Sequence, residues 1–288
     1  MNYFAGLDVS LEETSVCTVD HDGEIVRETK VATDPNALYA ALADHADGLV
    51  RAGVEASSLG VWVHRELQNR GLPMNTVEAR HMRHSLSAMR NKTDRNDARG
   101  IGQMMRLGWF RAVHVKCVEN QKLKTLLANR RLLKRKLIDL ENHIRGALRT
   151  YGLRVGTVSR NQFETRVREL LEGSDFILET MIGTMLEARA ATMESYAKLH
   201  RIVLQVVKHD PLYRRFMAVP GVGPIAALMF KVAVDDPHRF SRSRTVGAHF
   251  GLTPRRFQSG TSIDYAGRIS KQGDVNVRGA CARRPPGF

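Results

Sequence analysis

Residues 3–32, YFAGLDVSLEETSVCTVDHDGEIVRETKVA, contain three short apolar runs separated by turn-forming residues. The first run ends in the acid Asp8, the second alternates, and the turn HDGE leads into the third. Short alternating runs joined by polar turns predict three strands connected by hairpins. The sheet is therefore expected to begin with antiparallel strands, with Asp8 at the end of the first.

Residues 34–107 continue with helix and strand signals in turn. The expected elements are a helix opened by Asp34-Pro35, a strand over 49–57, a helix over 59–71 closed by Gly71, a strand over 74–79 and a helix capped by Thr93. Strand–helix–strand crossovers imply parallel strands with helices on the sheet faces. This is the element order of an α/β ribonuclease H-like (RuvC-like) domain, which we expect over residues 1–116.

Between residues 117 and 209 the apolar residues take the spacing of long helices. The stripe residues are Leu126, Leu133, Leu137, Leu140 and Ile144 in one run, and Met185, Met193, Tyr196, Leu199, Val203 and Val206 in the next. Arg189 is a polar gap in the second stripe, and Gly152 and Gly156 separate the two runs. We expect a long antiparallel coiled-coil insertion whose apolar stripes are structural.

Asp210-Pro211 breaks the second long helix and opens a C-terminal domain over residues 210–288. Within it, AVPGVGPIAALMF (residues 218–230) has the helix-hairpin-helix pattern. Its glycine turn either binds a DNA phosphate through backbone N–H groups and a helix N-terminus or simply packs two helices tightly, and both interpretations stay open. We expect a mainly helical domain with an unstructured tail, ACARRPPGF.

The charge of the chain favours a polyanionic partner. Its 288 residues carry 44 Lys and Arg against 30 Asp and Glu, which gives a formal charge of +14 and a pI near 10.1. The bases cluster around residues 91–100, NKTDRNDARG, and along residues 122–149. DNA is the expected partner.

Cysteine spacing and hydropathy indicate where the protein acts. Cys17, Cys117 and Cys281 lie far apart without a CxxC pair, which argues against a disulfide framework or a zinc module. No apolar run approaches the roughly 18–20 residues that cross a bilayer, and the N-terminus lacks a signal-peptide pattern. We expect a cytoplasmic protein with no membrane partner.

Asp94 and Asp97 are the acids inside the basic segment 91–100. Three residues apart at the start of a helix, they share one face. They either complement the helix dipole or, with phosphate oxygens, hold a hard divalent cation such as Mg²⁺.

Asp8 and Glu55 favour the metal interpretation. Each ends an expected strand among small and apolar residues, in GLDVS and GVEAS, where an unpaired carboxylate is costly. In a ribonuclease H-like sheet these strands are neighbours, and the final helix packs beside them. We therefore predict a two-metal Mg²⁺ site of Asp8, Glu55, Asp94 and Asp97, with surrounding bases on the DNA backbone.

A rival interpretation concerns the same first hairpin. Residues 6–26 also resemble the first phosphate loop of actin-like ATPases and sugar kinases. Those proteins need a second such hairpin and a nucleotide-binding Gly motif, and we find neither in the sequence.

Two serines in polar, glycine-rich segments are candidate nucleophiles. Ser259 lies in FQSGTS and Ser270 in GRISKQGD. A serine replaces water as the attacking group where a metal or base activates it, but Ser and Gly are also common in turns. Spacing alone selects neither serine.

Together these segments resemble the DEDD transposases of bacterial insertion sequences, relatives of the Piv DNA invertases. GLDVS, GVEAS and KTDRNDAR match the four acidic positions of the family's RuvC-like domain. PGVGPIAALMF, FGLTPRRFQSG and GRISKQGD match its C-terminal transposase domain. The resemblance covers nearly the whole chain.

The resemblance implies properties that the residues alone do not. It implies Mg²⁺ at the four acids and a covalent phosphoserine link to DNA, which the PxxxxSG stretch places at Ser259 in preference to Ser270. It also implies a homo-oligomer (dimer or tetramer) through the coiled coil and a site composed from two protomers. A structured non-coding guide RNA and a nucleoid-associated, prokaryotic location complete the expectation.

The sequence departs from the family after GDVNVR. The family continues into a helix there, whereas GACARRPPGF stops abruptly with adjacent prolines. This pattern indicates a frameshifted or truncated copy of the family's C-terminal domain, without this helix.

Three functions are compatible with these observations. The first is an Mg²⁺-dependent recombinase that excises and inserts its own element. The second is a Holliday-junction-type, structure-selective endonuclease that uses the same acids with water as nucleophile. The third is a non-catalytic nucleic-acid-binding remnant.

Overall fold

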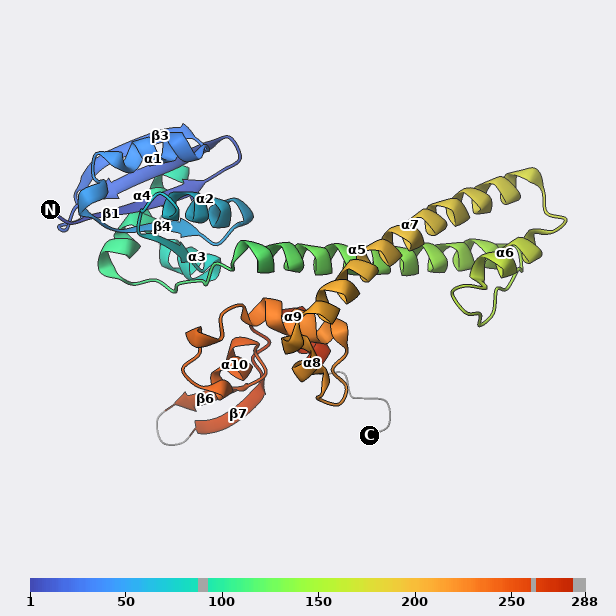
Figure 1. Ribbon diagram of the computed structural model, residues 1–288. Helices are drawn as coiled ribbons and strands as arrows, with labels where there is room; N and C mark the ends of the chain where they lie inside the picture. The colour runs from blue at the N-terminus through green and yellow to red at the C-terminus, as the bar shows by residue number, and fades with distance from the viewer. Residues whose placement is uncertain (88–92, 260–262, 282–288) are drawn as a thin grey trace. The chain divides into compact units, whose positions relative to one another are not determined.

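The computed structural model describes residues 1–87, 93–259 and 263–281 (Figure 1). The chain divides into two compact units, Met1–Val115 and Lys116–Phe288. Among the described residues, no helix combines the length and apolarity needed to span a membrane. The division into three domains at residues 116 and 209 stays a prediction.

The N-terminal unit is built on a mixed five-stranded sheet with the order β3-β2-β1-β4-β5. The strands are β1 (Tyr3–Val9), β2 (Glu13–Val19), β3 (Ile25–Ala32), β4 (Leu49–Glu55) and β5 (Met74–Val77). The first three strands pair antiparallel, whereas β4 runs parallel to both β1 and β5. The predicted hairpins and the partly parallel sheet are confirmed.

Helices cover both faces of this sheet. They are α1 (Pro35–Ala43), α2 (Ser58–Gln68), α3 (Ala79–Leu86) and α4 (Asp94–Leu107). Leu7 and Val54 of the sheet belong to the core under α1 and α2, and Phe4 and Cys17 belong to the core under α4. The sequence did not predict α3, because ARHMRHSL has too few apolar residues to form a stripe.

Two strand glycines let α4 lie directly on the sheet. A Cβ on Gly6 of β1 would fall 2.1 Å from the carbonyl oxygen of Ala98 and 2.3 Å from the backbone nitrogen of Gly102. A Cβ on Gly53 of β4 would fall 2.7 Å from Cγ2 of Ile101. Any side chain at Gly6 would therefore displace the helix backbone.

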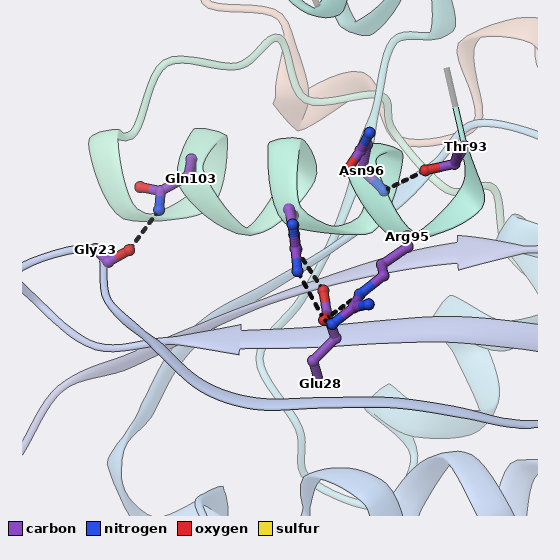
Figure 2. A network of polar contacts seen from close by, with 7 residues as sticks. Gly23, Glu28, Thr93, Arg95, Asn96 and Gln103 are labelled. Carbon is purple, nitrogen blue, oxygen red and sulfur yellow. Dashed lines mark hydrogen bonds and ion pairs between the residues drawn. The ribbon is translucent and has the colours of Figure 1, made fainter. Parts of the chain in front are cut away.

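Polar contacts fix the direction in which α4 crosses the sheet (Figure 2). Late in the helix, Gln103 donates to the carbonyl oxygen of Gly23 (2.7 Å), in the turn between β2 and β3. Early in the helix, Arg95 and Arg99 both bind Glu28 within β3. Because that turn lies beside the start of β1, α4 runs antiparallel to β1 and its first turn points toward the end of β1.

Glu28 anchors the first half of α4. Its carboxylate is 13% exposed and accepts hydrogen bonds from Nε (2.5 Å) and Nη2 (2.9 Å) of Arg99 and from Nε of Arg95. These hydrogen bonds, from Arg99 first and Arg95 second, lower the pKa of Glu28 from 4.5 to about 2. Glu28 is therefore charged wherever the protein is near neutral pH.

The second unit begins with two long helices. They are α5 (Val118–Thr150) and α7 (Phe176–His209), with α6 (Phe163–Leu171) between them in the chain (Figure 1). Arg130 of α5 donates to the hydroxyl of Tyr196 in α7 (2.7 Å), and further along α5, Glu141 binds Arg189, which comes earlier in α7. The two helices are antiparallel, as predicted.

The buried face of α7 differs in register from the predicted stripe. Leu137 and Ile144 of α5 and Val203 of α7 are buried as expected, but Met185 and Val206 are only half-buried. The residues buried in α7 are Leu178, Ile182, Leu186, Arg189, Val203 and Val207. In the first half of α7 the predicted register fails because the helix packs against α6 and the segment before it as well as against α5. In the second half, Val203 and Val207 are buried in a cluster with residues of α8 and α9, and Val206 lies at its side.

Arg189, the predicted polar gap, lies inside the core at 1% exposure. Its guanidinium donates to Oε1 of Glu141 (2.9 Å) and to the carbonyl oxygen of Arg160 (2.7 Å), and it lies over the ring of Phe163. A charge this deeply buried persists only with such partners.

The rest of the second unit, as far as the structure describes it, is mainly helical, as expected, and contains the hairpin β6–β7. Its elements are α8 (Pro211–Met217), α9 (Pro224–Val234), α10 (Ser243–His249), β6 (Pro254–Ser259), β7 (Ile263–Ile269) and α11 (Val275–Cys281). The glycine-rich segments around Ser259 and Ser270 were expected to be loops, but residues 257–259 of the first and 267–269 of the second belong to the strands of the antiparallel hairpin β6–β7. Residues 270–274 lie outside the strands, as expected, and residues 260–262 lie outside the described part of the chain.

The end of the described chain also differs from expectation. The last described helix, α11, consists of VNVR and the next three residues, and its Val277 is buried with Ala233 and Phe250. The absence of the family's further helix stays a prediction, because the residues after Cys281 lie outside the described part of the chain. Ala280 and Cys281, predicted to begin an unstructured tail, belong to this helix. The remainder of the predicted tail lies outside the described residues.

Substitution of two glycines tests the contact between α4 and β1. Gly6→Ala should lower the free energy of unfolding of the N-terminal unit by about 2 kcal/mol or more, because the new methyl group overlaps helix backbone. A Cβ on Gly102 would lie 3.5 Å from its nearest neighbours. Gly102→Ala is therefore the matched control and should change stability by less than about 1 kcal/mol. Urea unfolding measures both, and equal losses would contradict the close approach at Gly6.

The anchoring role of Glu28 predicts a pH-dependent effect of Glu28→Gln. A lowered pKa in the folded state contributes stability above the unfolded value of 4.5, and this contribution disappears as pH falls toward about 2. The variant should be less stable than wild type at pH 7, and the difference should shrink at pH 3. Unfolding at the two pH values measures it, and a difference independent of pH would contradict the prediction.

Candidate active site

Asp8 and Glu55 are neighbours at one end of the sheet. In the parallel pair β1–β4, Leu7 lies opposite Val54, and the two acids are the next residues along each strand. Alternation along a strand places them on the face of Gly6 and Gly53, which α4 covers. Adjacent strands are about 4.8 Å apart, so the two half-buried acids come from one place in the fold.

The first turn of α4 brings the other two acids to the same end. Thr93 caps the helix as predicted, because its Oγ1 accepts a hydrogen bond from the backbone nitrogen of Asn96 (3.2 Å) (Figure 2). Asp97 is 8% exposed on the buried face of the helix, and Asp94 is exposed. Both acids lie in the turn that points toward the end of β1.

Lys30 lies at the same end of the sheet, where the charge of Asp94 acts on it. Lys30 of β3 pairs with Ser15 of β2, which pairs with Asp8 of β1, so these residues form one row across the sheet. The hydrogen bond from Lys30 to Glu13 raises the pKa of Lys30, and the negative charge of Asp94 raises it further. Asp94 therefore lies within electrostatic range of the row that contains Asp8.

The four carboxylates are suitable ligands for a hard cation, but their side chains are not arranged around a common point as metal ligands would be. Carboxylate oxygens are the ligands that Mg²⁺ prefers. Among the residues that the structure describes, no three His, Cys, Asp or Glu side chains are grouped so that they could hold a metal ion. The fold thus brings the four backbone positions to one end of the sheet, and Mg²⁺ binding stays a prediction.

Two arginines beside the aspartates do not have the surroundings that we expected. We predicted that the bases around Asp94 and Asp97 hold the DNA backbone. Arg95 and Arg99 both bind Glu28, and Lys92 lies outside the described residues, so DNA contact by these bases stays a prediction. The sequence did not single out Glu28, because it lies in an alternating strand far from α4 along the chain, and the register of β3 alone puts it under the helix.

Ser259 and Ser270 lie at opposite ends of the hairpin β6–β7. Ser259 is the last residue of β6, pairs with Ile263 and is exposed. Ser270 follows β7, is half-buried, and donates its backbone N–H to the carbonyl oxygen of Thr253 (2.9 Å). Of the two hydroxyl-bearing positions, Ser259 is the more accessible.

The predicted helix-hairpin-helix segment forms α8, a turn and α9. Gly221 in the turn has φ = 83°, a left-handed conformation that favours glycine. Asp210 caps α8 and also binds Lys231 of α9 (2.8 Å), so the two helices are fastened to each other. These contacts explain the glycine turn as a means of packing α8 against α9. Phosphate binding at this turn stays a prediction.

Family models match both units of the chain. A model described as "Transposase" (DEDD_Tnp_IS110) covers residues 5–153, and a model described as "Transposase IS116/IS110/IS902 family" covers residues 213–282. The first match contains all four acids, and the second contains Ser259 and Ser270.

Curated relatives carry the same description. The chain is 28% identical to the "Transposase for insertion sequence element IS1111A" of Coxiella burnetii, over 95% of this chain and 74% of that protein. It is 27% identical to the "Probable family 20 transposase" of Pseudomonas aeruginosa, over 78% of this chain and 67% of that protein. Since the first family model alone spans more than half of the residues, the chain belongs to the DEDD-type IS110 family of transposases.

Proposed function

We propose that the protein is a DNA transposase that excises and inserts its insertion sequence by Mg²⁺-dependent phosphoryl transfer. The observation that carries the proposal is the meeting of Asp8, Glu55 and the first turn of α4 at one end of the sheet. Membership of a transposase family supports action on DNA, and a charge of +14 suits such a substrate.

The proposal includes two assignments of architecture. The strand order β3-β2-β1-β4-β5, with acids at the ends of β1 and β4, supports a RuvC-like N-terminal domain. The antiparallel packing of α5 on α7 supports a coiled-coil insertion.

Asp8, Glu55, Asp94 and Asp97 would hold Mg²⁺, which would stabilise negative charge on the phosphate oxygens. Four carboxylates in one place repel one another unless a cation or protons intervene. The chain's own contribution is rigidity, because β1 and β4 pair directly and Glu28 holds α4 against the sheet. The backbone positions of the four acids are thereby held at one end of the sheet.

Ser259 is the proposed nucleophile. Its hydroxyl loses a proton, Oγ bonds to the phosphorus of the DNA strand, and one P–O ester bond breaks, which leaves a protonated sugar hydroxyl and a phosphoserine link. The reverse step with another sugar hydroxyl rejoins the strand and restores the serine. The exposure of Ser259 at the end of β6 supports this choice over Ser270.

Two partners complete the proposal, and both come from the family resemblance. Guide RNA binding is supported by the exposed lysines and arginines along α5, among them Lys124, Arg131 and Arg135. Self-association through the helical hairpin is supported by exposed apolar residues at the start of α7, namely Phe176 and Ile177.

Thermal unfolding in Mg²⁺ tests the acid site. A ligand that binds only the folded state at about 100 times its Kd adds about 2.7 kcal/mol, which raises Tm by several degrees. Wild type should show this rise and Asp8→Asn should not. Glu24→Gln, an exposed acid in the β2–β3 turn, is the control and should behave as wild type. An equal rise in Asp8→Asn would refute the assignment of that residue.

Trapping the protein on DNA tests the nucleophile. Wild type with nicked element-end DNA and Mg²⁺ should form a covalent adduct that survives denaturing electrophoresis, and Ser259→Ala should form none. Ser270→Ala is the control and should keep the adduct. Metal-dependent cleavage without an adduct would support the endonuclease alternative, and wild type inert on every DNA substrate would support the non-catalytic remnant.

A further inference from the structure

The hairpin β6–β7 exposes a pair of stacked aromatic rings. Phe257 and Tyr265 lie opposite each other in the antiparallel register, with ring centroids 5.1 Å apart and ring planes at 21°. They are 44% and 58% exposed. Cross-strand aromatic pairs stabilise hairpins, but this role does not require rings so open to solvent.

Ser259 lies on the same face of the hairpin as the rings. Side chains two residues apart along a strand point the same way, so Ser259 follows Phe257 on one face, about 6.8 Å further along β6. Gln258 and its partner Asp264 lie on the opposite face. The proposed nucleophile and the aromatic pair therefore face the same side of the hairpin.

Gly267 leaves room for the ring of Phe257 to lie against the hairpin backbone. A Cβ on Gly267 would fall 2.8 Å from Cε2 of Phe257, so the ring crosses the glycine backbone. Tyr265 is the more exposed of the two rings. The face therefore offers exposed aromatic surface on the same side of the hairpin as the hydroxyl of Ser259.

The charge of the hairpin indicates what binds this surface. Its two strands contain Arg255, Arg256 and Arg268 but only one acid, Asp264, which Arg256 binds. Arg255 and Arg268 are exposed. Aromatic faces among cationic side chains are the combination that binds single-stranded nucleic acid by base stacking. An apolar protein surface would match the rings but not the arginines.

We propose that Phe257 and Tyr265 stack on an unpaired base of the DNA strand and thereby position the adjoining phosphate at Ser259. This rests on the proposed role of Ser259 and adds two positioning residues to it. We call the two rings of Phe257 and Tyr265 the aromatic platform. Because a base inside a duplex has no free face, the aromatic platform selects DNA in which the base beside the reacting phosphate is unpaired. The hairpin thus discriminates by DNA shape and stacking rather than by base sequence.

Binding of the full-length chain to two matched DNA probes tests the proposal. One probe is a fully paired DNA duplex. The other has the same sequence but contains a single unpaired 2-aminopurine, a base whose fluorescence falls when it stacks on an aromatic ring. Wild type should bind the unpaired probe about tenfold more tightly than the paired probe and quench it. The double variant F257L/Y265L keeps apolar bulk without aromatic faces and should lose both the preference and the quenching. Its affinity for the paired probe should not change, because phosphate contacts remain.

Two controls separate this proposal from the function on which it rests. Gln258→Ala changes the opposite face of the same strand and should keep the preference. Ser259→Ala should also keep it, since the hydroxyl takes no part in stacking, while it loses the covalent adduct. Wild type could form no adduct and still lose its preference for the unpaired probe in F257L/Y265L. That result would support base stacking on Phe257 and Tyr265 and contradict the proposed phosphoserine chemistry.

Several results would overturn the platform. One is equal affinity of wild type for both probes, and another is a preference that survives in F257L/Y265L. Equal weakening on both probes would give the hairpin a structural or purely electrostatic role, and lost self-association with unchanged DNA binding would make it a protein contact. If F257L/Y265L does not fold, Phe257→Trp is the second variant, because it keeps an aromatic face. Loss of the preference for the unpaired probe in Phe257→Trp would also contradict the proposal.

Discussion

The direct contact of α4 with β1 at Gly6 is the constraint on which the N-terminal unit depends. Because a Cβ there would fall 2.1 Å from helix backbone, the helix rests on the sheet with no side chain between them. Gln103 and Glu28 then fix its direction, so its first turn lies toward the end of β1. The proposed metal ligands are therefore placed by packing and hydrogen bonds of the chain itself, before any cation binds.

Local patterns predicted much of this unit, and tertiary contacts account for what they missed. Strand alternation and the Thr93 cap depend on neighbouring residues, so the sheet, α4 and the end-of-strand positions of Asp8 and Glu55 could be predicted. Glu28 could not, because its role depends on the register of β3 under α4. In α7, packing against α6 buries Leu186 where an isolated coiled coil would bury Met185.

The second unit presents its candidate chemistry differently. The acids of the first unit lie where strands and helix pack closely, whereas Ser259 lies exposed at the end of a two-stranded hairpin. The sequence predicted loops there because glycine and serine dominate it, yet alternating Phe257 and Ser259 make one face of a strand. Helix α11 begins within GDVNVR and places Val277 in the core with Ala233 and Phe250.

Anomalous diffraction from crystals soaked in Mn²⁺, a substitute for Mg²⁺, tests the central claim most directly. The account predicts two peaks roughly 3.5–4 Å apart, bounded by the carboxylates of Asp8, Glu55, Asp94 and Asp97. Peaks held by other residues, or none at the shared end of β1 and β4 while Mn²⁺ binds elsewhere, would contradict it.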